Sequence, residues 1–141
     1  MDYNTIISII IVLFLVALLM YFIYKQIKEE YMQDDPLLKE LKFTMMEAFP
    51  NEMKNIRLYK GDKSYTINKE KIYLCMKDKN NQYYNKDILT HVILHEMAHT
   101  QCPEIGHTEL FQDIFQDLME KAHEKGIYNI HEPIPDDYCM Y

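Results

Sequence analysis

The sequence is poor in cysteine, has no internal repeat or low-complexity segment, and has no basic residue ahead of its long apolar run. Its three cysteines, Cys75, Cys102 and Cys139, are an odd and sparse set, which argues against a disulfide framework and is typical of a reducing compartment. For Cys102 and Cys139, a buried and inert thiol is the favoured interpretation. The 141 residues are enough for one small domain.

The apolar run from Thr5 to Tyr24 carries no charge. At about 1.5 Å per residue in a helix, it is long enough to cross a hydrocarbon core of about 30 Å. A cleaved signal peptide is disfavoured, because Asp2 precedes the run and bulky aromatic residues end it. Lys25 and Lys28 follow the run, so the positive-inside rule places the C-terminal part in the cytoplasm, or in a virion interior or at a host membrane if the protein is viral.

The chain is expected to contain a short N-terminal segment (1–4), a transmembrane anchor (5–24), a helical stalk (25–35) and an α+β domain (36–141). At the start of the domain, Asp35 is expected to be a helix N-cap, with Pro36 at the first helical position. Apolar residues then recur at helical spacing up to Phe49, which predicts a helix that packs onto the domain.

After this helix, alternating apolar and polar residues predict a small antiparallel sheet of three strands at residues 56–59, 65–67 and 72–76. A helix is expected over about residues 86–100, capped by Asn85 or Asp87. A second helix is expected from about residue 108 to 125. Residues 127–141 are expected to form an ordered but irregular tail.

The most informative stretch is His-Glu-Met-Ala-His at residues 95–99. On a helix, His95 and His99 lie one turn apart on the same face, where both imidazoles can bind one metal ion. Glu96 can reach a water molecule on that metal, so the pattern is that of a zinc hydrolase site with Glu96 as the catalytic group and Zn²⁺ as the cofactor. The apolar flanks favour this interpretation over two unrelated histidines on an ordinary helix.

Catalytic zinc commonly takes three protein ligands and leaves a fourth position for water. His107 is the favoured third ligand, because Gly106 before it allows the chain to turn back toward the metal. Glu104 and Glu109 are rival ligands. An inhibitory cysteine ligand at the water position is disfavoured for Cys102 and Cys139. His91, one turn ahead of the motif, is interpreted as a helix-start or supporting histidine, because three successive helical turns rarely converge on one ion.

Charge is distributed unevenly along the chain, whose net charge is −7. Residues 52–79 contain eight basic and four acidic residues, whereas residues 87–141 contain eleven acidic and two basic ones. A solvated sheet face explains the basic stretch, and nucleic-acid binding would require a more concentrated patch on a less acidic domain. We therefore expect no nucleic-acid partner. A protein or peptide substrate is expected from the histidine-glutamate motif rather than from the charge.

The motif at 95–99, followed by Gly106-His107 and an aromatic residue at Phe111, resembles that of the WLM metallopeptidases and the related SprT-like zincins. The sequence is most similar to small WLM-like predicted peptidases of large DNA viruses, over about residues 56–139. The resemblance implies a zincin-like domain with three histidine ligands, at positions 95, 99 and 107, and Glu96 as acid/base. One departure is the gap between His99 and His107, which is longer than the gap usual in the cellular members of these families. The loop at residues 100–105 lies in this gap.

The sequence thus predicts a membrane-anchored zinc endopeptidase that hydrolyses peptide bonds through a zinc-activated water. The donor for the developing oxyanion is left open among His123, His131, Tyr128 and Tyr138. Three alternatives stay open: an inactive zincin acting as a membrane-bound binding or virion structural protein, a DNA–protein crosslink protease, and a purely structural zinc domain. The SUMO- or ubiquitin-interacting segments of the cellular relatives are not visible in the sequence.

Overall fold

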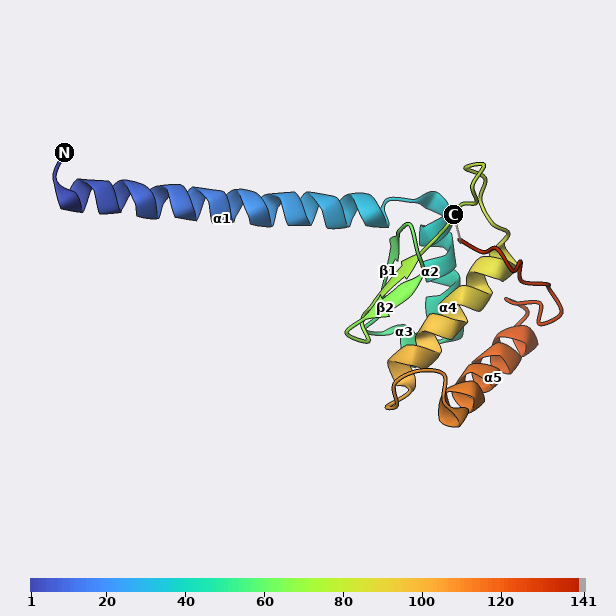
Figure 1. Ribbon diagram of the computed structural model, residues 1–141. Coiled ribbons are helices and arrows are strands. Elements are labelled where there is room, and N and C mark those ends of the chain that lie inside the picture. Colours follow the sequence, from blue (N-terminus) through green and yellow to red (C-terminus); the bar gives the residue numbers. More distant parts are fainter. Residues whose placement is uncertain (140–141) are drawn as a thin grey trace. The chain divides into compact units, whose positions relative to one another are not determined.

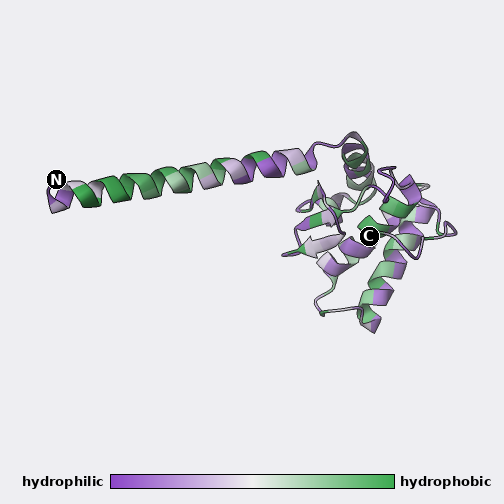
Figure 2. Ribbon diagram, turned by 45° about the horizontal axis from the view of Figure 1, so that its top comes forward, coloured by the Kyte–Doolittle hydropathy of each residue, from purple (hydrophilic) through white to green (hydrophobic). Residues whose placement is uncertain are grey.

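The computed structural model describes residues 1–139, which form two compact units, Met1–Met32 and a second unit that begins at Gln33. The first unit is made by α1 (Tyr3–Gln33), a continuous helix of 31 residues without a buried side chain (Figure 1). Apolar residues cover most of α1 and give way to polar ones toward its end (Figure 2). The helix is long and apolar enough to cross a membrane, and the expected anchor and stalk are parts of this one helix.

The second unit begins with α2 (Pro36–Ala48), as the sequence predicts. The side chain of Asp35 accepts a hydrogen bond from the backbone N–H of Leu38 at 3.0 Å, which satisfies one of the free donors at the helix start. One face of α2 is buried, through residues Leu38, Leu41 and Met45. A short helix, α3 (Pro50–Met53), follows directly where the sequence predicted only a helix end.

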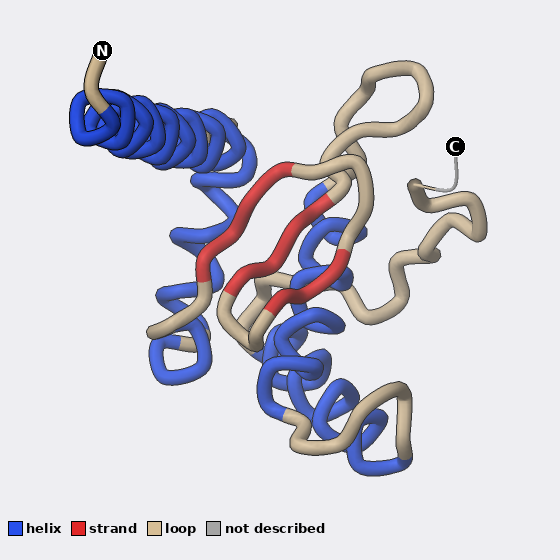
Figure 3. The backbone as a smooth tube through the Cα atoms, turned by 60° about the vertical axis from the view of Figure 1, so that its left-hand side comes forward, coloured by secondary structure: helices blue, strands red, loops and turns tan. Residues whose placement is uncertain are grey.

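The sheet is mixed, so the expectation of an antiparallel sheet is wrong in part. Its strands are β1 (Arg57–Lys60), β2 (Tyr65–Ile67) and β3 (Lys71–Leu74), in the spatial order β1-β3-β2 (Figure 3). β2 pairs with β3 in the antiparallel sense, whereas β1 pairs with β3 in the parallel sense. The most apolar strand takes the central position, because Ile72 and Leu74 become fully buried there. The four residues 61–64, which connect β1 to β2, therefore pass over the end of β3, and they bridge two strand spacings of about 10 Å in total.

Two helices complete the domain and lie side by side, α4 (Lys86–Gln101) and α5 (Glu109–Glu124). α4 packs against β2 and β3 on one side and against α5 on the other. Its buried positions include Leu89, Ile93 and Met97, none of which is exposed at all. The α+β class is therefore confirmed, with helix boundaries within one residue of the prediction for both α4 and α5.

The tail after α5 returns to the sheet and is joined to it covalently. Cys75 and Cys139 form a disulfide, which corrects the expectation that the cysteines are unpaired. Cys102 is free and buried, as expected. The two cysteines lie 64 residues apart in sequence, so no local sequence pattern predicts their pairing. The argument for a reducing compartment, which rested on unpaired cysteines, no longer holds. The tail is irregular up to residue 139, as predicted. The prediction also covered residues 140 and 141, which lie outside the described residues.

Candidate metal centre

The helix α4 presents the first two histidines on one face. The side chain of Asn85 accepts a hydrogen bond from the N–H of Ile88 at 2.8 Å, which defines the helix start ten residues before His95. His95 and His99 are half-buried, and their ring centroids lie 5.0 Å apart. The apolar side of the same helix packs into the core, so the two rings point away from the core toward α5 and the loop before it.

The third histidine comes from the loop that joins α4 to α5. Gly106 adopts φ +85°, a left-handed conformation that turns the chain immediately before His107. The Thr108 hydroxyl then accepts a hydrogen bond from the N–H of Phe111 and caps α5. As a result, Nε2 of His107 lies 3.1 Å from Nε2 of His95 and 3.1 Å from Nε2 of His99.

Among the residues that the structure describes, these three histidines form the group whose side chains can share a metal ion. One ligand atom from each lies within 4.8 Å of the others. Nitrogen ligands at about 2.1 Å in a tetrahedral zinc site are about 3.4 Å apart, close to the two distances observed. The donor set, three imidazole nitrogens, is one that catalytic zinc uses, so the residues present fit this ion.

An aromatic side chain supports all three rings. Phe111, at 1% exposure, stacks on His99 with ring centroids 4.3 Å apart and lies 4.8 Å from His107 and 5.1 Å from His95. Phe115 adds an edge contact to His95 at 5.2 Å. Phe111 lies within the helix expected over about residues 108–125, but the sequence did not reveal that it fixes the histidine rings, because that contact depends on how α5 packs against α4.

Burial lowers the pKa of the two α4 imidazoles in this group. Desolvation, followed by the neighbouring His99 and His107, lowers the pKa of His95 to about 4. Burial and His107 also lower the pKa of His99. A metal ligand must be a neutral imidazole, so these two side chains need not lose a proton at pH 7 to bind a cation.

Glu96 is a buried carboxyl, with 7% of its surface exposed. Burial raises its pKa, whereas the hydrogen bond from Thr66 and the nearby His107 act in the opposite direction. The Thr66 hydroxyl donates to Oε2 of Glu96 at 2.6 Å. No sequence signal pointed to Thr66, because β2 and α4 are brought together only by tertiary packing.

The rival ligands lie outside this group. Glu104 and Glu109 are exposed and are not members of the described metal-binding cluster. His91 is also outside it, and its Nδ1 is hydrogen-bonded to the hydroxyl of Tyr128 at 2.9 Å. Tyr128 is thereby engaged with α4 rather than with the three-histidine group.

The other candidate oxyanion donors are also engaged elsewhere. The Tyr138 hydroxyl donates to the backbone oxygen of Cys75 at 2.7 Å. Nδ1 of His123 is hydrogen-bonded to the backbone oxygen of Tyr128 at 3.0 Å, and its ring lies 6.0 Å from that of His131. None of these contacts involves the three-histidine group, so the structure singles out no oxyanion donor among them.

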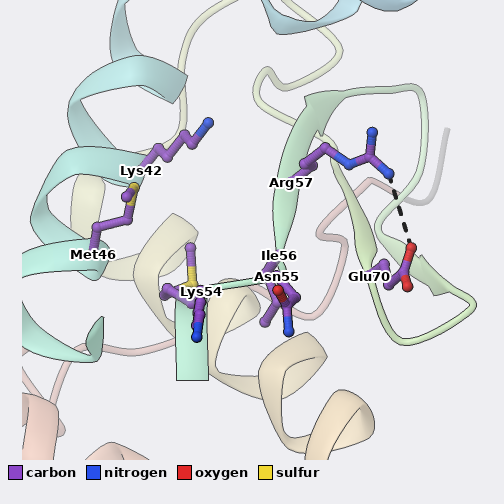
Figure 4. A pocket seen from close by; sticks show the side chains of 8 residues that line it. Lys42, Met46, Lys54, Asn55, Ile56, Arg57 and Glu70 are labelled. Atoms are coloured by element: carbon purple, nitrogen blue, oxygen red, sulfur yellow. Dashed lines mark ion pairs between the residues drawn. The ribbon is translucent and has the colours of Figure 1, made fainter. Parts of the chain in front are cut away.

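A pocket of about 410 Å³ lies elsewhere on the domain, between α2, α3 and the start of β1 (Figure 4). Three basic side chains contribute to its lining: Lys42, Lys54 and Arg57. The guanidinium of Arg57 is 3.8 Å from the carboxylate of Glu70. No residue of the three-histidine group lines this pocket.

The fold and the site together define an α+β domain that carries a three-histidine candidate metal centre beside a buried carboxylate. No protein-family model matches the chain, and no solved structure matches it significantly. Three viral proteins are similar to it in sequence.

Uncharacterized protein 136R of Invertebrate iridescent virus 6 is 42% identical over 110 residues, which cover 74% of this chain and 62% of that protein. Uncharacterized protein 042R of Invertebrate iridescent virus 3 is 40% identical over 90 residues, covering 63% and 57%. Uncharacterized protein R325 of Acanthamoeba polyphaga mimivirus is 37% identical over 120 residues, covering 75% and 61%. The chain thus spans about six tenths of the length of each of these relatives.

Proposed function

We propose that this protein is a zinc-dependent endopeptidase held at a membrane by α1. The observation that carries the proposal is the convergence of three histidine Nε2 atoms next to the buried carboxylate of Glu96. Three neutral nitrogen ligands leave a fourth coordination position for water or substrate. The resemblance of the motif to the WLM and SprT-like zincins supports the same assignment.

In this proposal, the three histidines hold the ion, and the packing of Phe111 keeps their rings in place. When bound, zinc would lower the pKa of a water molecule and polarise the scissile carbonyl group. Glu96 accepts a proton from the attacking water and passes it to the leaving amine nitrogen as the C–N bond breaks. His107 acts to lower the pKa of Glu96, so this carboxylate lies within electrostatic reach of the histidine group.

Replacing the proposed base tests this function. With zinc present, the full chain in detergent should cleave a mixture of unfolded proteins, and Glu96→Gln should lower that rate by about 100-fold or more. Glu104→Gln is the matched control, because this exposed glutamate lies near the site in sequence but outside the metal-binding group. Equal activity of Glu96→Gln and wild type would contradict the proposed role of Glu96.

The membrane part of the proposal rests on α1 and its flanks. Lys25 and Lys28 follow the apolar stretch, and the positive-inside rule therefore favours a cytoplasmic C-terminal domain. In intact cells, an added protease should leave that domain uncut and should degrade it only after the membrane is permeabilised. Cleavage in intact cells, or a Cys75–Cys139 disulfide that stays fully oxidised in vivo, would argue for the opposite orientation.

A further inference from the structure

The Thr66 hydroxyl is directed at the proposed base from a different part of the chain. It donates to Oε2 of Glu96 at 2.6 Å, a short charge-assisted distance, and lies 3.4 Å from the backbone oxygen of the same residue. Thr66 pairs with Ile72 across β2 and β3, so both side chains lie on the sheet face against which α4 packs. The contact therefore follows from strand register and helix packing rather than from sequence proximity.

Both ends of β2 are held in place. Before the strand, Ser64 Oγ accepts a hydrogen bond from the N–H of Cys75 at 3.0 Å and is bonded to the Tyr138 hydroxyl at 2.8 Å. After the strand, Lys69 Nζ donates to the backbone oxygen of Cys102, at the end of α4, at 2.8 Å. The Ser64 contacts hold the start of the strand at the end of β3 and at the tail, and the Lys69 contact holds the other end at α4. The Thr66 hydroxyl between them therefore has a defined position.

A carboxylate on a flexible side chain acts as a base only when one of its oxygens faces the proton that it takes. A hydroxyl donor on Oε2 restrains the rotation of the Glu96 carboxylate and leaves Oε1 outside this hydrogen bond. Orientation of this kind is worth a large factor in rate, because a displacement of about 1 Å can cost about 100-fold. The carboxylate is also nearly out of solvent, so water competes poorly with Thr66 for Oε2.

We propose that Thr66 is a positioning residue for peptide-bond hydrolysis, holding Oε2 of Glu96 so that Oε1 accepts the proton of the attacking water. This inference rests on the proposed zinc peptidase function. Thr66 does not touch the substrate or the metal in this role; it acts through Glu96.

The test compares two substitutions at one position. Thr66→Val keeps the shape of the side chain and removes its hydroxyl, whereas Thr66→Ser keeps the hydroxyl. With full chain in detergent, zinc and fluorescently labelled casein, Thr66→Val should lower kcat about 10- to 100-fold with KM within about twofold of wild type. Thr66→Ser should restore kcat to within about threefold. Zinc content should stay at the wild-type value in both variants, and both should be fully folded at the assay temperature. The thermal midpoint of Thr66→Val should fall modestly, because a buried carboxylate loses a hydrogen-bond donor.

Thr100→Val is the matched control, because the Thr100 hydroxyl donates to the backbone oxygen of Met97 at 2.7 Å and not to Glu96. In a Glu96→Gln background, Thr66→Val should cause no further loss, because the two residues act as a unit. An unchanged kcat in Thr66→Val, or a loss that follows lower zinc content or unfolding at the assay temperature, overturns the inference and leaves the peptidase proposal standing. Absence of zinc-dependent cleavage by wild type overturns both.

Discussion

A His107→Ala variant should bind zinc more than about 100-fold more weakly than wild type, because even the loss of a supporting contact around a metal costs about 10- to 100-fold. Nε2 of His107 lies 3.1 Å from the corresponding atoms of His95 and His99, so its removal opens one side of the group. Mass spectrometry of the metal content, after dialysis against a weak chelator, gives the measurement.

His91→Ala is the control for this experiment, because His91 lies on the same helix but is bonded to Tyr128. It should keep its zinc. Equal zinc content in wild type and His107→Ala would rule out His107 as a ligand. The same samples separate a catalytic from a structural site. If the domain loses its fold when His107 is replaced, as small zinc-dependent folds do, a structural zinc domain is favoured over the peptidase.

The double variant Cys75→Ser, Cys139→Ser should be less stable than wild type by about 2–4 kcal/mol in the free energy of unfolding. The disulfide closes a loop over a sequence separation of 64, and the entropy of that loop in the unfolded chain grows with its length. Urea unfolding, followed by circular dichroism without reductant, measures the difference.

A reductant provides the control for the disulfide. Wild type treated with dithiothreitol should unfold at the same urea concentration as the double variant, whereas the double variant itself should not respond to reductant. A wild-type midpoint that does not change under reduction would show that the pair contributes nothing to stability. Without the bond, hydrogen bonds still hold the tail, among them those of the Tyr138 hydroxyl with Ser64 and with the backbone oxygen of Cys75.

Much of the candidate site follows from local rules. The spacing of four between His95 and His99 places both on one face of any helix, whatever surrounds it. Asn85, Gly106 and Thr108 are local signals as well, for a helix start, a left-handed turn and a second helix start. Because these signals act within a few residues, the amino-acid sequence alone was sufficient for the boundaries of α4 and α5.

Other expectations depended on partners that lie far apart in the chain. The sheet was expected to be antiparallel because successive short strands usually form hairpins, but β3 lies between β1 and β2 in order to bury Ile72 and Leu74. The pairing of Cys75 with Cys139 is equally non-local. An alternating pattern defines a strand's faces but not its neighbour, and a cysteine count does not define which thiols meet.

What the sequence by itself determined is therefore the longer helices, their caps, the long apolar segment and the presence of a histidine-glutamate motif. Each of these depends on the periodicity and conformational preference of neighbouring residues. Only the tertiary structure decided which strand lies at the centre, that Phe111 supports the three imidazoles, and that Thr66 reaches Glu96. These features depend on which buried surfaces pack together, and that choice is made by the whole domain at once.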